Sequence, residues 1–417
     1  MPDKFFPIKT KTACQLKWNF STVRLYSGDS GSCHRVNPTL LSLDTFDNFH
    51  NTEKTVNDRK LMLDGQWPTG GCEYCQRLEM SGHQSDRLFQ LKIPNLVPFE
   101  LESDPAAVVV TPRIVEVYLD NVCNMSCLYC WDGFSSKIHQ ENQKFGEFNQ
   151  DGVVIKNKSS RHPDQEQMTE RFWLWLDKHY IELRRLHILG GEPFFQPQFE
   201  TCLEFLESHT NPELELSIFT NLKVSSNKLE RFVERIKKLL AEGRIKRLDI
   251  TCSIDCFGIE QEYIRYGINL DQWRKNFEYL VSKKWITLNI NQTLVNIAIK
   301  TIPELIRYVN QVSGDRKIVH YFSTPVFTYE FLHPRIFGPG FFDDDFKKIL
   351  SEMNDTTVLE KEFKQNMTAI WKELNIGTRS NKLIHQLSVY LTELDRRRNL
   401  DWKKTFPWLA KEVENVV

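Results

Sequence analysis

The chain has 417 residues, of which 41% are hydrophobic and 26% are charged. Its 54 Lys and Arg residues balance 55 Asp and Glu residues, so the formal charge at neutral pH is -1. This length exceeds one small module and fits one large α/β domain with additional segments. A charge near zero supplies no field to hold a phosphate backbone, which argues against nucleic acid and anionic membrane surfaces as partners.

Neither a membrane span nor a secretion signal is evident in the sequence. Apolar runs such as 106–110 are far shorter than the roughly 18 residues of a transmembrane helix. The first residues, MPDKFFPIKTKTACQ, lack an apolar stretch behind their charges, so we predict no signal peptide and a cytoplasmic protein. In a reducing compartment the ten cysteines are expected to be metal ligands or core thiols rather than disulfides.

Residues 1–100 show few periodic segments and are predicted to form a small module organised by a metal. Four cysteines lie in this part: Cys14, Cys33, Cys72 and Cys75. Four thiolates can fully ligate a 4Fe-4S or 2Fe-2S cluster, and they can also form a closed zinc site. Zinc ribbons usually pair two Cys-x2-Cys knuckles, and only one is present. We therefore expect an iron-sulfur cluster, with zinc as the alternative, and note His34 and His83 as possible substitutes for one thiolate.

A Pro-punctuated link over 98–112 leads into alternating strand and helix patterns. Strands are predicted at 113–121, 184–189, 214–220, 247–255, 286–294 and 318–326. Helices are predicted at 167–180, 199–209, 228–242, 270–284 and 302–312. Six strands separated by helices indicate right-handed βαβ units and a parallel sheet. A complete eightfold barrel needs two more units, so we predict an α/β fold with a partial (β/α)6 TIM-like barrel over residues 110–330.

Two further segments flank or interrupt this predicted barrel. Residues 135–165 are polar and only weakly periodic, and we interpret them as a surface insertion or lid. From about residue 341 onward only helical patterns remain, at 342–353, 361–374, 382–394 and 402–413. These patterns predict a C-terminal helical extension over 340–417.

Three more cysteines follow the first predicted strand, with the spacing Cys-x3-Cys-x2-Cys: Cys123, Cys127 and Cys130. Active sites of α/β barrels lie at the carboxyl ends of the strands, so these thiols are presented on the functional face. A 4Fe-4S cluster held by three thiolates keeps one iron open, whereas electron-transfer clusters normally have four protein ligands. That iron could bind a substrate or cofactor. A closed zinc site would need a fourth Cys or His, and none is adjacent.

With Tyr129 directly before the last cysteine, this spacing resembles the signature of the radical S-adenosylmethionine (radical SAM) superfamily. The resemblance implies that the open iron binds the amino and carboxylate groups of SAM. One electron then cleaves SAM to methionine and a 5'-deoxyadenosyl radical, which takes a hydrogen atom from the substrate. It also implies a reducing partner of the flavodoxin or ferredoxin type.

Later strand ends carry residues similar to other motifs of this family. Gly190-Gly191-Glu192-Pro193 resembles the Gly-Gly-Glu-Pro motif that receives the SAM amino group. Its glycines allow close backbone approach, and its carboxylate can accept hydrogen bonds from an ammonium group. The resemblance implies further SAM contacts from Thr220, Asn221, Ser253, Asp255 and Arg265.

The N-terminal cysteines, followed by Ser85-x-Arg87, resemble the auxiliary-cluster module called twitch, a shortened SPASM domain. Such a module usually follows the barrel of a radical SAM enzyme, and here it precedes it. The resemblance implies a second iron-sulfur cluster that takes up an electron or anchors the substrate. The other cysteines, Cys202, Cys252 and Cys256, are expected to pack in the core.

Basic residues gather at 235–247 and 396–404, interleaved with apolar residues at helical spacing. This pattern is typical of a solvated amphipathic helix face rather than an RNA-binding groove.

The main functional hypothesis from the sequence is a radical SAM enzyme acting on a peptide, a protein or a small metabolite. The alternatives are a radical SAM enzyme that modifies RNA or nucleosides, and a non-catalytic iron-sulfur or zinc protein.

Overall fold

The computed structural model of the chain describes residues 10–80, 85–88, 107, 109–158, 161–316, 318–323 and 329–415. Two compact units divide the chain: the first comprises 1–121, 159–218 and 236–247, and the second comprises 122–158, 219–235 and 248–417. Within the described ranges, no helix has the length and apolar character needed to cross a membrane. The domain limits expected from the sequence, 1–100, 110–330 and 340–417, stay a prediction.

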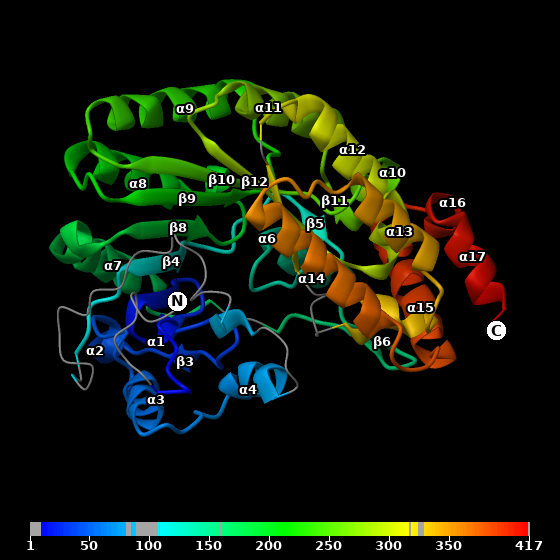
Figure 1. Cartoon of the computed structure of the whole chain (residues 1–417), viewed down its shortest axis with the longest axis horizontal. Helices are drawn as coiled ribbons and strands as arrows, with labels where there is room; N and C mark the ends of the chain where they lie inside the picture. Colours follow the sequence, from blue (N-terminus) through cyan, green and yellow to red (C-terminus); the bar gives the residue numbers. More distant parts are fainter. Residues whose placement is uncertain are drawn as a thin grey trace. The chain divides into compact units, whose positions relative to one another are not determined.

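The first unit contains a mostly parallel sheet (Figure 1). Its strands, in spatial order, are β9 (Glu215–Thr220), β8 (Arg185–Leu189), β4 (Ile114–Tyr118), β1 (Phe20–Arg24), β2 (Asp29–Gly31) and β3 (Thr39–Leu40). β1, β4, β8 and β9 pair in parallel, and β2 and β3 add antiparallel. β4, β8 and β9 lie where the alternating patterns predict them.

The strands β1 to β3 are absent from the sequence-based prediction. Phe20 pairs with Ile114 and Arg24 with Tyr118, so residues expected in a separate metal-organised module extend the same sheet as β4. β1 was missed because three of its five residues are polar or charged, Ser21, Thr22 and Arg24, and they do not alternate with the apolar ones. Ser21 and Thr22 are nevertheless buried, so the run gives little period-2 signal.

Within the described part of the first unit, six helices have four or more residues, and a seventh, α9, is shared by residues of both units. They are α1 (Leu16–Asn19), α2 (Leu43–Phe46), α3 (Glu53–Leu63), α4 (Cys72–Met80), α7 (Gln165–His179), α8 (Pro197–Ser208) and α9 (Ser226–Ala241). Short 3-10 turns lie at η1 (Tyr180–Glu182) and η2 (Pro193–Phe195). The Thr52 hydroxyl accepts from the Thr55 N–H and so caps α3, while Pro197 starts α8 at a position where no N–H is needed.

The second unit has its own parallel strands, in the order β10 (Arg247–Ser253), β12 (Thr287–Thr293) and β13 (Val319–Ser323). Residues 324–326 of the predicted sixth strand lie outside the described part of the chain. A short antiparallel pair joins β5 (Ser126–Cys127) to β11 (Arg265–Tyr266). Together with the first unit, this gives a mixed α/β protein rich in parallel strands. Closure into a partial barrel stays a prediction.

The segment 135–165, predicted as a weakly periodic insertion, contains regular structure. α6 (Ser136–Phe145) begins where the Ser135 hydroxyl accepts from the Ile138 N–H. A hairpin follows, β6 (Phe148–Gln150) with β7 (Val153–Ile155). Its turn residues Asp151 and Gly152 both have positive φ, as two-residue hairpin turns require. Strands of three residues are too short to show alternation.

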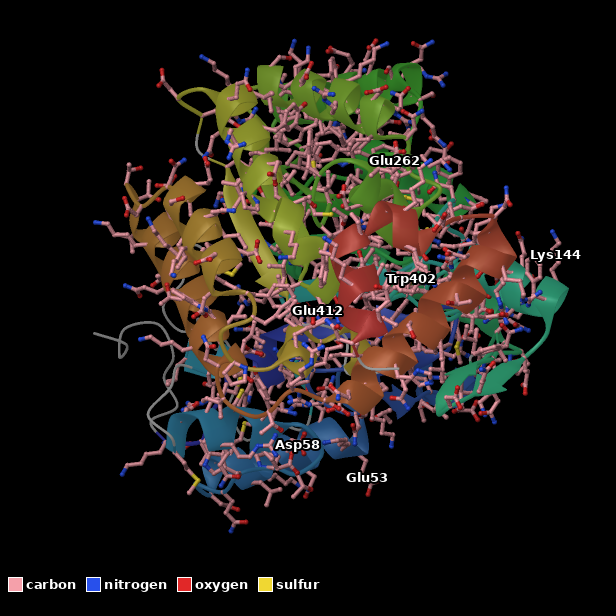
Figure 2. All side chains as sticks on the ribbon, turned by 90° about the vertical axis from the view of Figure 1, so that its right-hand side faces the viewer. Glu53, Asp58, Lys144, Glu262, Trp402 and Glu412 are labelled. Carbon is pink, nitrogen blue, oxygen red and sulfur yellow. The ribbon has the colours of Figure 1, made fainter. Side chains whose placement is uncertain are left out.

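The remaining helices of the second unit are α10 (Ile259–Ile264), α11 (Leu270–Ser282), α12 (Ile302–Ser313), α13 (Asp343–Glu352), α14 (Val358–Leu374), α15 (Asn381–Arg398), α16 (Trp402–Thr405) and α17 (Pro407–Glu414). Short 3-10 segments lie at η3 (Asn296–Thr301), η4 (Glu330–Leu332) and η5 (Pro334–Phe337). The pattern at 402–413 predicts one helix, but the chain forms two because Pro407 starts a new one. Trp402 is buried among these C-terminal helices (Figure 2).

Candidate functional site

The loop that carries the three clustered cysteines belongs to the second unit and is held by backbone hydrogen bonds. Within it, Cys127 lies in β5 opposite Arg265 of β11. The Leu128 N–H donates to the Ile264 carbonyl at 2.9 Å, and the Cys130 N–H donates to the Cys127 carbonyl at 3.0 Å. The cysteine spacing therefore folds into one short bridged turn rather than an extended loop.

Asp255, which follows β10, has a fully buried carboxylate that is hydrogen-bonded to this turn. It accepts from the Tyr129 hydroxyl at 2.8 Å, from Nε and Nη2 of Arg265 at 2.8 Å each, and from the Thr293 N–H at 2.9 Å. Four donors occupy its two oxygens. Sequence similarity suggested that Asp255 and Arg265 contact SAM, and in the structure they bond to each other.

In this buried network Arg265 stays charged and Tyr129 stays neutral. Burial opposes the charge on Arg265, but Asp255 and then Tyr129 raise the pKa of its guanidinium well above the ordinary value. Burial raises the pKa of Tyr129 well above its ordinary value, so its hydroxyl stays protonated and donates. A buried ion pair of this kind is stable only when its hydrogen bonds are complete, and here those on the carboxylate are.

The three thiols influence one another. Burial raises the pKa of Cys130, and the neighbouring Cys127 and Cys123 raise it further. Burial also raises the pKa of Cys127, against an opposing effect of Arg265. Thiols buried in this way lose their protons when a bound metal stabilises the thiolates. Three thiols in one turn are the donor set that a 4Fe-4S cluster with one open iron would use.

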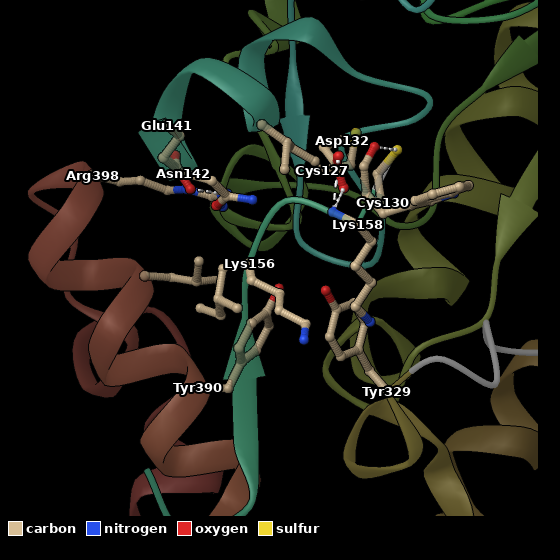
Figure 3. A pocket seen from close by; sticks show the side chains of 14 residues that line it. Cys127, Cys130, Asp132, Glu141, Asn142, Lys156, Lys158, Tyr329, Tyr390 and Arg398 are labelled. Atoms are coloured by element: carbon tan, nitrogen blue, oxygen red, sulfur yellow. Dashed lines mark hydrogen bonds and ion pairs between the residues drawn. The ribbon is translucent and has the colours of Figure 1, made fainter. Parts of the chain in front are cut away.

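A cavity borders this turn within the second unit (Figure 3). It is lined by Cys127, Cys130, Trp131, Asp132, Ile138, Glu141, Asn142, Ile155, Lys156, Lys158, Tyr329, Tyr390, Leu394 and Arg398. Lys156 and Lys158 are exposed and follow β7, and the Lys158 N–H donates to the buried Asp132 carboxylate at 3.1 Å. The segment predicted as an insertion thus supplies one wall of the cavity, and α15 supplies another.

Two more residues predicted from family resemblance lie close to the cysteine turn. Asn221 donates from Nδ2 to Oδ1 of Asn124 at 2.9 Å, and Asn124 stands between the first two cysteines. The Thr220 hydroxyl accepts from the Leu222 N–H at 3.0 Å, and this residue is buried. Ser253, at the end of β10, is half-buried. Thr220 therefore shapes the turn after β9, while Asn221 joins that turn to the cysteine loop.

The Gly190 to Pro193 motif lies in the first unit, directly after β8. Gly190 has φ 87°, and a Cβ there would lie 2.7 Å from the Asp120 carbonyl oxygen, so a side chain is excluded. Glu192 is buried, and its Oε1 accepts from the Phe194 N–H at 3.3 Å. Pro193 begins η2. Close backbone packing thus accounts for the first glycine of the motif.

The four N-terminal cysteines come together in the first unit. All four line one cavity. Cys72 starts α4 and Cys75 lies one turn later, so both side chains share a helix face. Burial and then the neighbouring Cys33 raise the pKa of Cys14 to about 12, and burial raises that of Cys33 to about 11.

Sequence reasoning missed the cations around this cavity. Lys17 is 1% exposed and pairs with Asp58 at 2.5 Å. Arg35 pairs with Asp86 at 2.7 Å, and Arg87 donates to the Ala13 carbonyl at 2.8 Å. All three cations line the same cavity. A lysine among apolar neighbours gives no sequence signal of its own, and its contact with the cysteines becomes visible only in the fold.

Neither histidine near these cysteines is supported as a ligand. His34 does not line the cavity, and its Nδ1 lies 3.5 Å from Oε1 of Glu116. His83 lies outside the described residues. Cys202, Cys252 and Cys256 are buried in the core as expected.

Over the described ranges, no three Cys, His, Asp or Glu side chains converge on a point that a single ion could occupy. The four N-terminal thiols nevertheless surround one space. Four thiolates around one space can hold an iron-sulfur cluster or a closed zinc site.

No protein-family model matches the chain, and no curated protein matches it. Among solved structures it is similar to Streptococcus suis SuiB bound to S-adenosylmethionine, at 15% identity over 73% of this chain and 61% of that one, with a TM-score of 0.35. A second structure of Streptococcus suis SuiB matches at 14% identity over 74% of this chain and 61% of that one, with a TM-score of 0.34. anSMEcpe with bound AdoMet and the Cp18Cys peptide matches at 14% identity over 64% and 62%, with a TM-score of 0.32.

The chain thus spans less than two thirds of each of these proteins. Similarity at this level carries no argument about its activity, which has to come from its own residues.

Proposed function

We propose that this chain is a radical SAM enzyme. The observation that carries the proposal is the short bridged turn that holds Cys123, Cys127 and Cys130, because three thiolates suit a cluster with an open iron. When bound, such a cluster supplies the site and the electron for cleavage of SAM to methionine and a 5'-deoxyadenosyl radical that takes hydrogen from the substrate.

The chain's own residues would perform three tasks. Tyr129, Asp255 and Arg265 hold the cysteine turn in place through their buried network. Asn221 fixes the turn from the side of β9 through Asn124. Glu192, at the end of β8, offers a buried carboxylate of the kind that accepts from an ammonium group such as that of SAM.

We further propose that Cys14, Cys33, Cys72 and Cys75 hold a second iron-sulfur cluster rather than zinc. Support comes from the cavity that the four thiols share and from the single Cys-x2-Cys pair, since zinc ribbons usually have two. Lys17, Arg35 and Arg87 line the same cavity, each paired with a carboxylate, Asp58, Asp86 and Glu79 respectively. The same proposal assigns these four cysteines to a module like twitch, the shortened SPASM domain.

The proposed substrate is a peptide, a protein or a small metabolite, and the proposed partner is a flavodoxin-like or ferredoxin-like electron donor. Both clusters require reduced thiols, so we place the protein in the cytoplasm. RNA or nucleoside modification and a non-catalytic iron-sulfur or zinc protein are the competing hypotheses.

An anaerobic binding experiment tests this proposal. The full chain, reconstituted with iron and sulfide and reduced with dithionite, should show an EPR signal that changes on addition of SAM, because SAM binds the open iron. The Cys127→Ala variant should lose the SAM-sensitive signal and keep that of the N-terminal cluster. An EPR spectrum that SAM leaves unchanged would favour a non-catalytic carrier, and stoichiometric zinc at the N-terminal cysteines would overturn the second-cluster proposal.

A further inference from the structure

Helix α15 ends in three consecutive arginines with different surroundings. The side chain of Arg396 is 57% exposed, as the predicted solvated face requires. Those of Arg397 and Arg398 are 0% and 3% exposed, so the prediction of a solvated face is wrong for both. Burying two guanidinium groups is costly unless each one is paired and hydrogen-bonded.

Arg397 has a structural explanation. Its Nε donates to Glu393 of the same helix at 2.6 Å, its Nη1 to Asn142 at 3.1 Å, and its Nη2 to the Gly146 carbonyl at 2.9 Å. All three nitrogens are used, and two of them tie α15 to α6 and to the residue that ends it. This arginine therefore joins two helices.

Arg398 differs because one of its nitrogens is left over. Nε and Nη2 donate to the two oxygens of Glu141 on α6, at 2.9 and 3.1 Å. The guanidinium stacks over the Tyr266 ring, with its central carbon 5.1 Å from the ring centroid. Nη1 is buried and has no hydrogen-bond partner within the part of the chain that the structure describes. A buried, unsatisfied donor of this kind calls for a missing acceptor.

The position of Arg398 indicates what that acceptor is. It lines the cavity that Cys127 and Cys130 also line, and it extends from α15 toward Glu141 (Figure 3). Lys156 and Lys158 line the same cavity but are exposed, so water screens them. Arg398 lines it as a cation whose side chain is 3% exposed.

We propose that Arg398 tunes the cluster at the three-cysteine turn, raising its reduction potential through its charge and its free N–H. This inference rests on the proposed function. Reduction brings one electron from an external donor and makes the cluster one unit more negative, with no proton required. A fixed cation and a donor to sulfur favour the reduced state, because cluster potentials follow net charge and hydrogen bonding to the sulfurs. Arg398 acts through the cluster and is not itself a catalytic residue.

Two substitutions should shift this potential in opposite directions. Arg398→Gln removes the cation and leaves Glu141 negative, so the ratio of reduced to oxidised cluster at a fixed solution potential should fall about tenfold, equivalent to about 59 mV for one electron. Glu141→Gln leaves the cation without its counter-charge, so the same ratio should rise. Arg396→Gln is the matched control, on the same helix but exposed, and should leave the ratio unchanged.

The measurement is an EPR-monitored redox titration of the full-length reconstituted protein, following the signal that SAM perturbs. Opposite shifts for the two variants support the inference, since a merely structural role would move both the same way or neither. Equal potentials, or shifts of the same sign, overturn it. If Arg398→Gln fails to fold, Glu141→Gln decides alone, and an unchanged or lowered ratio in that variant overturns the inference.

The outcome separates this inference from the function on which it rests. Variants that bind iron, respond to SAM and show one common potential refute only the role of Arg398. A wild-type protein that acquires no SAM-sensitive cluster refutes both.

Discussion

The hydroxyl of Tyr129 donates a hydrogen bond to Oδ2 of Asp255 at 2.8 Å, across 126 residues of sequence. Tyr129 lies between the second and third clustered cysteines, so this bond connects the cysteine turn to the end of β10. Arg265, which pairs with Cys127 across the β5 and β11 ladder, binds the same carboxylate. The geometry of the turn therefore depends on one buried carboxylate.

Removal of that carboxylate should be severe. Asp255→Asn leaves Arg265 buried without its counter-charge, and breaking a buried pair in this way costs about 3–5 kcal/mol. We expect a large fall in the free energy of unfolding, measured by urea denaturation of the protein without iron, together with poor iron incorporation at the three-cysteine turn. Loss of stability below about 1 kcal/mol would show that the network does not hold the turn.

The Tyr129→Phe variant tests the same network more gently. It deletes one donor and leaves Asp255 with its bonds from Arg265 and Thr293. A hydrogen bond to a charged group is worth about 1.5–3 kcal/mol, so the expected loss of stability lies in that range, with iron binding retained. A Tyr266→Phe variant is a suitable control, because among the described residues its hydroxyl donates to the Arg398 carbonyl alone, at 3.4 Å.

A close backbone contact at Gly71 should control the N-terminal cluster. Gly71 has φ 131°, and a Cβ there would lie 2.1 Å from the Arg35 carbonyl oxygen, directly before Cys72. Gly71→Ala should therefore cost at least about 1–3 kcal/mol of strain and reduce the iron bound by the N-terminal cysteines. Gly65→Ala also has positive φ but meets no atom within 4 Å, and it should retain that iron. Equal iron contents in the two variants would contradict this role of the contact.

The two proposed clusters should separate under mutation. Cys72→Ser should lower the iron content from about eight to about four per chain if both clusters are 4Fe-4S, because the first unit loses one of its four thiolates. The SAM-sensitive EPR signal should persist. Zinc in the wild type that disappears in this variant would identify the N-terminal site as a zinc site.

Acid should destabilise the first unit through His50. Burial, and then the charge of Arg59, lower the pKa of this histidine to about 3, and its Nε2 lies 3.0 Å from the Trp18 carbonyl oxygen. The unfolded chain binds a proton near pH 6.5 and the folded chain does not, so stability is present above that pH and declines as pH falls toward 3. The slope from this group is about 1.4 kcal/mol per pH unit.

The check is a pair of urea denaturation series, for the wild type and for His50→Gln, between pH 7 and pH 4. The Gln side chain has no proton to gain, so the difference in unfolding free energy between the two proteins should change with pH. A difference that stays constant over this range would show that His50 does not control the acid response.

The sequence predicts the regular elements of this chain well where the segments are long. The helices predicted at 270–284 and 302–312 correspond to α11 and α12, because their apolar residues repeat at helical spacing over three turns. Its limits appear where strands are very short or rich in polar residues. β6 and β7 have three residues each, and three of the five residues of β1 are polar or charged. β4 and β8 also have five residues but are rich in Val, Ile and Leu, and they were predicted.

The candidate site divides along similar lines. Cysteine spacing alone identified the two groups of thiols, since thiols are rare and their intervals are distinctive. The burial of Lys17 beside Asp58 and of Arg398 beside Glu141 depends on contacts between segments distant in sequence. Charged residues in helical patterns are normally solvated, which is why the arginines at the end of α15 were predicted on a solvent-exposed face.

The central claim is that the Cys123, Cys127 and Cys130 turn supports reductive cleavage of SAM. The most direct measurement is the formation of 5'-deoxyadenosine from SAM by the anaerobically reconstituted full chain with dithionite, followed by liquid chromatography. The account predicts product with the wild type and with Cys72→Ser, and none above background with Cys127→Ala. Absence of product from the iron-loaded wild type, or equal product from Cys127→Ala, would contradict it.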